Sequence, residues 1–182
     1  RNRIRKNVKN IVITFGGTHQ KKKTQKILEI LKKMELKKPE LIVILGLGYS
    51  KRIEIKKMVK EMNQMEFNIK IIEKSDNLSE YFKRCDFAIT SNGRTVFEIA
   101  AMKIPMIAIA VNNRERLHSF VRYSKCGFHI DMYSKQDYSI VIRKISDMLD
   151  YENREKFVKN LHDVELLNGI NKVKELIYKK LS

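Results

Sequence analysis

The sequence predicts an α/β fold with a doubly wound parallel sheet of about six strands. Three observations support this prediction. Short runs rich in β-branched residues alternate along the chain with segments of helical periodicity. The runs at 41–45 and 106–111 are apolar at every position, which is typical of strands in a sheet covered on both faces. Helical segments follow most of these runs and would supply the crossovers that parallel strands require.

Each predicted strand is a short apolar run bounded by turn residues. The run at 10–15 is rich in β-branched residues and ends at Gly16 and Gly17. The run at 41–45 ends at Gly46. Pro105 precedes the run at 106–111, at a strand start where a missing N–H group is tolerated. The remaining strands are expected at 69–72, 87–90 and 128–130.

Helices are predicted where apolar residues recur every three to four positions. Segment 25–34 shows this spacing, and comparable patterns predict helices around 55–62, 78–82 and 95–102, followed by a helical tail from Tyr138 to Leu181. No repeat or linker interrupts the pattern, so we expect a single domain over residues 1–182. The chain opens on Arg1 rather than on methionine, so we expect this domain to be part of a longer protein.

The charge of the chain is strongly positive. It has 38 Lys and Arg against 21 Asp and Glu, a formal net charge of +17. This charge could attract nucleic acid or an anionic membrane, or it could reflect lysines on the outer faces of helices. No aromatic RNA-binding motif or zinc-finger spacing is present, which disfavours nucleic acid, whereas contact with a membrane surface stays open.

The sequence carries no membrane span, secretory leader or metal motif. No apolar run approaches the ~20 residues that a span needs, and no signal-peptide pattern opens the chain. Cys85 and Cys126 lie far apart with no nearby His pattern, so we expect reduced thiols and no metal site. We therefore expect a cytoplasmic protein, with a peripheral contact to the membrane surface left open. Cys126 is interpreted as a small buried residue and His129 as structural or exposed.

Three loops after predicted strands could hold a ligand, because ligands bind beyond the carboxyl ends of parallel strands. The loops at 15–19 and 46–50 contain glycines that permit tight turns, and each could equally be a plain strand-to-helix connection. The loop at 90–98 is more informative: Ser91, Asn92 and Gly93 turn the chain into a helix that begins near Arg94 or Thr95. Backbone N–H groups at such a helix start favour an anion such as pyrophosphate.

Glu98 has two interpretations that its spacing does not separate. As an acidic residue near a helix start, it would stabilise that helix by about 0.3–1 kcal/mol. As a ligand-binding residue, its carboxylate would accept hydrogen bonds from ribose hydroxyls, as the acidic residue of dinucleotide-binding folds does.

The stretch from Cys85 to Pro105, CDFAITSNGRTVFEIAAMKIP, resembles the nucleotide-sugar-binding segment of GT-B enzymes. Within this group the chain resembles the N-acetylglucosaminyltransferase that makes lipid II and the UDP-sugar hydrolase of pseudaminic acid biosynthesis, and it resembles the spore-coat polysaccharide biosynthesis proteins more closely than these two. Residues 15–18 resemble the second glycine loop of this family, residues 112–118 its sugar-contacting loop, and residues 167–169 the turn before its last helix. The likeness covers most of the chain and implies the Rossmann-like C-terminal half of a GT-B fold.

The resemblance implies a role for each part of the site. Glu98 would bind the ribose, the loop after the fourth strand would cradle the pyrophosphate, and backbone at 74–75 would read uracil. The nucleotide- and phosphate-binding residues would be Gly16, Gly17, Thr18, Lys74, Ser75, Ser91, Asn92, Gly93, Arg94, Thr95 and Glu98; the sugar-contacting residues would be Asn113, Glu115 and His118. Arg94 departs from the small residue frequent in relatives, so its guanidinium could reach the phosphates directly.

The resemblance also implies that this chain holds the donor and lacks the catalytic base. In both enzyme relatives the proposed base lies in the N-terminal half, and no matching segment occurs here. His19 and His118 are the candidates within this chain, each with a contact role as the alternative. The expected partners are a UDP-sugar, as substrate with no further cofactor, and an N-terminal GT-B domain or a partner subunit. A complete subunit of a two-subunit enzyme and a non-catalytic nucleotide- or nucleic-acid-binding module are the alternatives.

Overall fold

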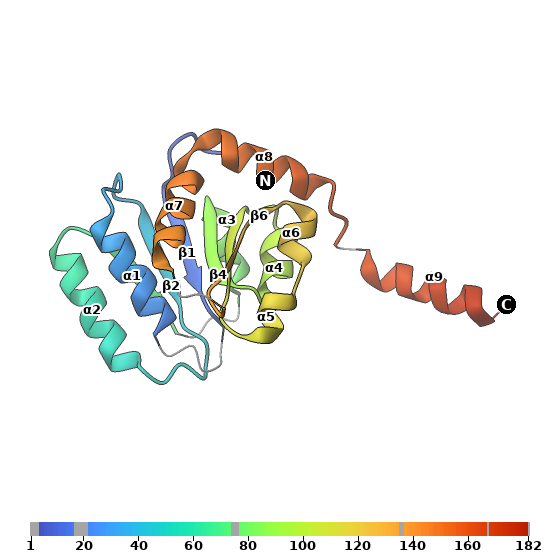
Figure 1. Ribbon diagram of the computed structural model, residues 1–182, viewed down its shortest axis with the longest axis horizontal. Helices are drawn as coiled ribbons and strands as arrows, with labels where there is room; N and C mark the ends of the chain where they lie inside the picture. Colours follow the sequence, from blue (N-terminus) through green and yellow to red (C-terminus); the bar gives the residue numbers. More distant parts are fainter. Residues whose placement is uncertain (1–3, 17–21, 74–76, 135–136, 167, 182) are drawn as a thin grey trace.

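The computed structural model describes residues 4–16, 22–73, 77–134, 137–166 and 168–181 (Figure 1). Six parallel strands form one sheet in the order β3-β2-β1-β4-β5-β6. This arrangement confirms the predicted doubly wound parallel sheet. The strands are β1 Asn10–Thr14, β2 Glu40–Ile44, β3 Asn68–Ile72, β4 Phe87–Ser91, β5 Met106–Ala110 and β6 Gly127–Asp131.

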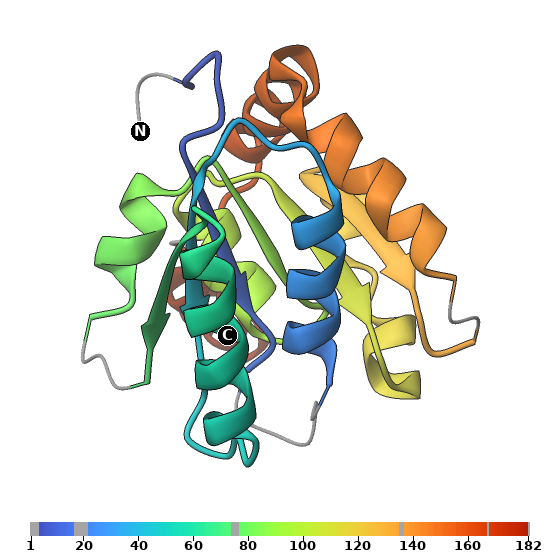
Figure 2. The same cartoon turned by 90° about the vertical axis from the view of Figure 1, so that its left-hand side faces the viewer.

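Helices cover both faces of the sheet (Figures 1 and 2). Helices α1, α2 and α7 lie on one face, while α4 and α6 lie on the other, and α8 crosses one end of the sheet. Their bounds are α1 Lys23–Lys33, α2 Arg52–Gln64, α3 Ser79–Arg84, α4 Thr95–Ala101, α5 Asn113–Leu117, α6 Phe120–Ser124, α7 Tyr138–Leu149, α8 Tyr151–His162 and α9 Gly169–Leu181.

The alternation of side chains along the strands explains the two-sided core. Ile13 pairs in register with Val43 and Ile89, and all three side chains are buried on the face covered by α1, α2 and α7. The neighbouring position Val12 pairs with Ile42 and points to the opposite core, formed with α3, α4 and α6. Apolar residues at every strand position are therefore buried on both faces, as the sequence pattern indicates.

Two charged side chains anchor the segment before β1. The Asp86 carboxylate is buried and accepts hydrogen bonds from the Arg5 side chain and from the backbone N–H groups of Lys9 and Asn10. The guanidinium of Arg154, fully buried on α8, donates to five backbone carbonyls, those of Arg5, Lys6, Met148, Leu149 and Asp150. Arg154 thereby joins the segment before β1 to the end of α7.

The structure adds detail at places where sequence periodicity is weak. Helices α5 and α6 were not predicted, because each has only five residues and too few turns to show a period. The predicted helical tail consists of α7, α8 and α9, and α9 extends away from the sheet (Figure 1). Val173, Leu176 and Ile177 on α9 are exposed. In the described part of the chain, no helix combines the length and the apolar character needed to cross a membrane.

Candidate functional site

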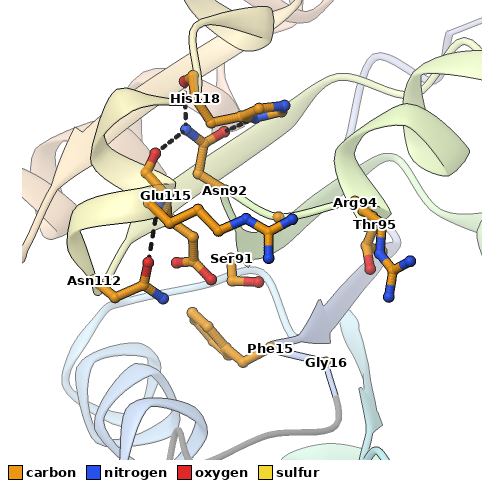
Figure 3. A pocket seen from close by; sticks show the side chains of 11 residues that line it. Phe15, Gly16, Ser91, Asn92, Arg94, Thr95, Asn112, Glu115 and His118 are labelled. Atoms are coloured by element: carbon orange, nitrogen blue, oxygen red, sulfur yellow. Dashed lines mark hydrogen bonds between the residues drawn. The ribbon is translucent and has the colours of Figure 1, made fainter.

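A pocket of about 350 Å³ opens at the carboxyl ends of β1 and β4 (Figure 3). These two central strands are neighbours, and the strand order reverses between them, since β2 and β3 lie beyond β1 while β5 and β6 lie beyond β4. Ligands of open α/β sheets bind at such a reversal point. The pocket is lined by Phe15, Gly16, Ser91, Asn92, Gly93, Arg94, Thr95, Asn112, Arg114, Glu115 and His118.

The floor of the pocket follows β1. Phe15 is buried, and its ring faces the pocket beside Gly16 (Figure 3). Gly16 has a φ of 74°, in the left-handed region where residues with a side chain are strained. A residue with a side chain would therefore strain the backbone at Gly16.

The loop between β4 and α4 forms one wall. Ser91 is buried at the end of β4, while Arg94 is exposed at the start of α4, beside Thr95 (Figure 3). Gly93 lies between them, and its φ is outside the left-handed region. A Cβ atom placed on Gly93 would meet Ser91 Oγ at 3.5 Å and Glu115 Oε1 at 3.9 Å, both ordinary contact distances. The protein therefore leaves room for a methyl group at Gly93.

Helix α5 forms the facing wall. Asn112 caps the helix, and its side-chain oxygen accepts a 2.9 Å hydrogen bond from the backbone N–H of Glu115. The Glu115 carboxylate in turn accepts a 3.1 Å hydrogen bond from the backbone N–H of Val111. These reciprocal bonds resemble a capping box, and they turn the chain from β5 into the pocket wall.

Asn92 connects the two walls. Its side chain is buried, and its amide nitrogen donates hydrogen bonds of 2.7 Å and 2.8 Å to the backbone carbonyls of Glu115 and His118 (Figure 3). Its backbone N–H donates to the carbonyl of Ile109 on β5. These bonds occupy the donors of Asn92, so a phosphate contact from this residue, which stays a prediction, would require one of them to break.

His118 follows α5 at the rim of the pocket. Its Nδ1 lies 3.5 Å from Asn92 Oδ1, and its ring meets the Phe97 ring edge-on at a centroid distance of 5.3 Å. Phe97 on α4 also packs against Phe120 on α6, at 4.6 Å between ring centroids. The aromatic contact holds the His118 ring against α4 beside the pocket.

The pocket brings together eight of the residues predicted from the sequence: Gly16, Ser91, Asn92, Gly93, Arg94, Thr95, Glu115 and His118. Glu98 and Asn113 are exposed and do not line it, and the Asn113 side chain accepts hydrogen bonds from Arg116. Gly17, Thr18, His19, Lys74 and Ser75 lie outside the described residues. The ligand contacts expected of all these residues remain predictions.

Arg114 is a lining residue to which sequence reasoning assigned no role. Arg114 lies within the loop at 112–118, which the resemblance implies is sugar-contacting. Its positive charge was the feature of the sequence that could have indicated contact with an anionic donor. Among the residues that the structure describes, neither Arg94 nor Arg114 has a hydrogen bond or ion pair from its guanidinium. The two guanidinium groups are available to an anion bound in the pocket.

Two other titratable groups behave as buried structural residues. Cys126 is fully buried, and burial raises the pKa of its thiol, which agrees with its interpretation as a small core residue. His129 on β6 is half-buried, and burial lowers the pKa of its imidazole below the ordinary value. Within the described ranges, no group of three or more His, Cys, Asp or Glu residues is arranged to hold a metal ion.

Comparison with known families and sequences gives consistent matches. The family model described as "Glycosyl transferases group 1" matches residues 1–163. The uncharacterized protein MJ1062 of Methanocaldococcus jannaschii is 33% identical over 111 residues, which cover 61% of this chain and 22% of that protein. A Clostridium tetani protein is 25% identical over 185 residues, covering 96% of this chain and 48% of its own length. Its name is UDP-N-acetylglucosamine--N-acetylmuramyl-(pentapeptide) pyrophosphoryl-undecaprenol N-acetylglucosamine transferase.

Solved structures share the fold at low sequence identity. The crystal structure of Acinetobacter baumannii MurG superposes with a TM-score of 0.76 at 15% identity, over 94% of this chain and 50% of that one. The chain therefore spans about half the length of MurG and of the clostridial transferase, and less of MJ1062.

Proposed function

The chain belongs to the group 1 glycosyl transferases, and from this premise we propose that it is the donor-binding half of a GT-B enzyme that acts on a UDP-sugar. Its pocket would hold the nucleotide and pyrophosphate of the donor. A second domain or subunit would bring the acceptor. A transferase and a hydrolase share the donor pocket and differ in what attacks the donor, an acceptor hydroxyl or water. The proposal therefore covers both reactions.

The observation that carries the proposal is the pocket at the reversal point of the sheet, with Gly93 in its lining. Because a Cβ at Gly93 would fit the protein, the fold does not require glycine there. A ligand that approaches the backbone closely would account for the presence of glycine at this position. Arg94 and Arg114 lie in opposite walls of the pocket and supply positive charge suited to a diphosphate. The start of α4 also lines the pocket, and the dipole of a helix favours an anion at its N-terminus.

Two further features support a uridine nucleotide with its ribose near α4. The clostridial relative is named for a UDP-N-acetylglucosamine donor, and it aligns with 96% of this chain. Glu98 lies four residues after Arg94 in the first turn of α4, about 6 Å further along a helix that rises 1.5 Å per residue. A carboxylate at that distance can accept hydrogen bonds from the ribose hydroxyls while the phosphates lie at Arg94. The exposed position of Glu98 leaves its oxygens free to face a bound nucleoside.

The catalytic base is proposed to come from outside this half. Among the described residues that line the pocket, Glu115 supplies the one carboxylate, and it is engaged by the backbone N–H of Val111. His118 is packed edge-on against Phe97 and stays the candidate within the described chain. Closure of a second domain over the open pocket would supply the base and exclude water. A surface-polysaccharide or sialic-acid-like pathway and a cytoplasmic location at the membrane surface belong to the same proposal.

A nucleotide screen tests the proposal. Thermal unfolding of the chain is followed with UDP, GDP, CMP and UDP-N-acetylglucosamine. UDP and its sugar should stabilise selectively, by about 2.7 kcal/mol at 100 times the dissociation constant. Purified chain should not turn over UDP-N-acetylglucosamine. Failure of every nucleotide to stabilise, together with salt-dependent binding to DNA or RNA, would instead favour the nucleic-acid-binding alternative.

A further inference from the structure

Helix α5 is attached to the body of the protein mainly by polar contacts. It spans five residues, and none of them is buried. Leu117, the large apolar residue at its end, is 63% exposed. Since apolar burial contributes little here, hydrogen bonds decide where this helix lies. Yet α5 and the residue after it carry three lining residues of the pocket: Arg114, Glu115 and His118.

The side chain of Asn92, directly after β4, is linked to the end of α5 by two hydrogen bonds. Its amide donates to the carbonyls of Glu115 and His118 at 2.7 Å and 2.8 Å, so it fixes two points three residues apart. Asn92 is only 1% exposed, and the water-excluded position makes loss of these bonds costly. Asn92 itself is held to β5 through its backbone N–H.

We propose that Asn92 is a positioning residue that couples the phosphate-binding loop to the sugar-contacting helix. Asn92 lies between Ser91 and Gly93, so any shift of this loop when phosphate binds moves the anchor of α5. The placement of Arg114 and Glu115 then follows the occupancy of the phosphate site. The sugar is contacted by α5, and the position of α5 is set by the loop that binds the phosphates of the nucleotide. This inference rests on the proposed function.

Hydrogen exchange tests the link without any ligand. The backbone N–H groups of Glu115, Arg116 and His118 are bonded to Asn112 or Glu115 within α5. In Asn92→Ala their exchange should accelerate by about tenfold or more, the factor expected for removal of buried hydrogen bonds. Exchange at Ile107 and Ile109 in β5 should stay unchanged. Equal acceleration in α5 and β5, or none in either, would overturn the inference.

Binding tests the coupling, with Leu117→Ala as the matched control. Leu117 is on α5, is 63% exposed and does not line the pocket. Calorimetry with UDP and UDP-N-acetylglucosamine gives the ratio of the two affinities. Asn92→Ala should reduce the advantage of the sugar nucleotide by about tenfold while UDP affinity changes less, and the control should keep the wild-type ratio.

The outcomes separate the two proposals. If UDP binds but Asn92→Ala keeps the wild-type ratio, or if wild type shows no preference for the sugar nucleotide, the coupling is wrong and the donor-binding function stands. If neither probe binds, the donor-binding function and the coupling both fail, whereas accelerated exchange confined to α5 would still establish the structural link. An Asn92→Asp variant adds a check, because the carboxylate has the size of the amide and faces both carbonyls without a donor. It should release α5 at least as strongly as alanine.

Discussion

Replacement of Gly93 by alanine tests whether glycine is required for nucleotide binding or for stability of the fold. The added Cβ would lie 3.5 Å from Ser91 Oγ and 3.9 Å from Glu115 Oε1, so it meets no clash. The φ of Gly93 is outside the left-handed region, so alanine adds no backbone strain. A Gly-to-Ala change at a compatible position stabilises a protein by about 0.4–1 kcal/mol through the unfolded chain.

The same methyl group should weaken nucleotide binding. If phosphate approaches the backbone at Gly93, the methyl displaces it and weakens at least one hydrogen bond to a charged group, worth about 1.5–3 kcal/mol. Since about 1.4 kcal/mol corresponds to tenfold in affinity, UDP should bind about 10- to 100-fold more weakly. The melting temperature of the free protein should stay constant or rise by up to about 4 °C.

Calorimetric titration with UDP and thermal unfolding of the free protein measure both effects in one variant. Gly169→Ala is the matched control, because a Cβ at Gly169 meets nothing within 4 Å and the residue begins α9, away from the pocket. Unchanged UDP affinity in Gly93→Ala would refute the approach of phosphate to this backbone. A loss of affinity accompanied by a clear loss of stability would refute the geometric argument that alanine fits.

Three further changes test other parts of the structure. Glu98→Gln should weaken UDP binding by about 10- to 100-fold and hardly change the melting temperature, and wild type should lose affinity for 2′,3′-dideoxy-UDP. Equal binding of UDP and its dideoxy form by wild type would remove Glu98 from the site. Because burial lowers the pKa of His129, the native state favours its neutral form, so stability should fall as pH drops through the ordinary value near 6.5. Urea unfolding from pH 8 to 5 should show this fall in wild type and less of it in His129→Gln; identical pH profiles would contradict it. Arg154→Met should lose about 3 kcal/mol or more in urea unfolding, since five carbonyls lose their donor, and a loss below about 1 kcal/mol would show that water replaces the guanidinium.

Some features of the fold depend only on local chemistry. Strand runs such as 41–45 are apolar at every position because both faces of a covered sheet are buried, and this pattern is visible without any partner strand. Gly16 marks a left-handed turn that the local backbone alone requires. The loop from Ser91 to Thr95, which lines the pocket, could be singled out because a strand, a glycine and a helix start follow one another in the chain.

Local patterns do not report which distant segments meet. The five-residue α5 has no periodicity to reveal it, and its place beside the pocket depends on hydrogen bonds from Asn92, over 20 positions earlier. Asn92 is predicted from the sequence to contact phosphate, and only the structure reveals that its amide and backbone N–H groups donate to protein carbonyls. In the same way, Arg114 became part of the site only through the return of the chain after β5 to the end of β4.

The sequence by itself determined the class of fold, the segments that form strands and the glycine turns that follow them, because these depend on burial pattern and on backbone conformation within a few residues. Only the tertiary structure decided that β4 pairs with β1, that the pocket therefore lies between Phe15 and the loop after β4, and that α5 closes its third side. Strand order and the direction of a side chain such as that of Asn92 are set by contacts between residues far apart in the chain. Such contacts leave no periodic trace in a single sequence.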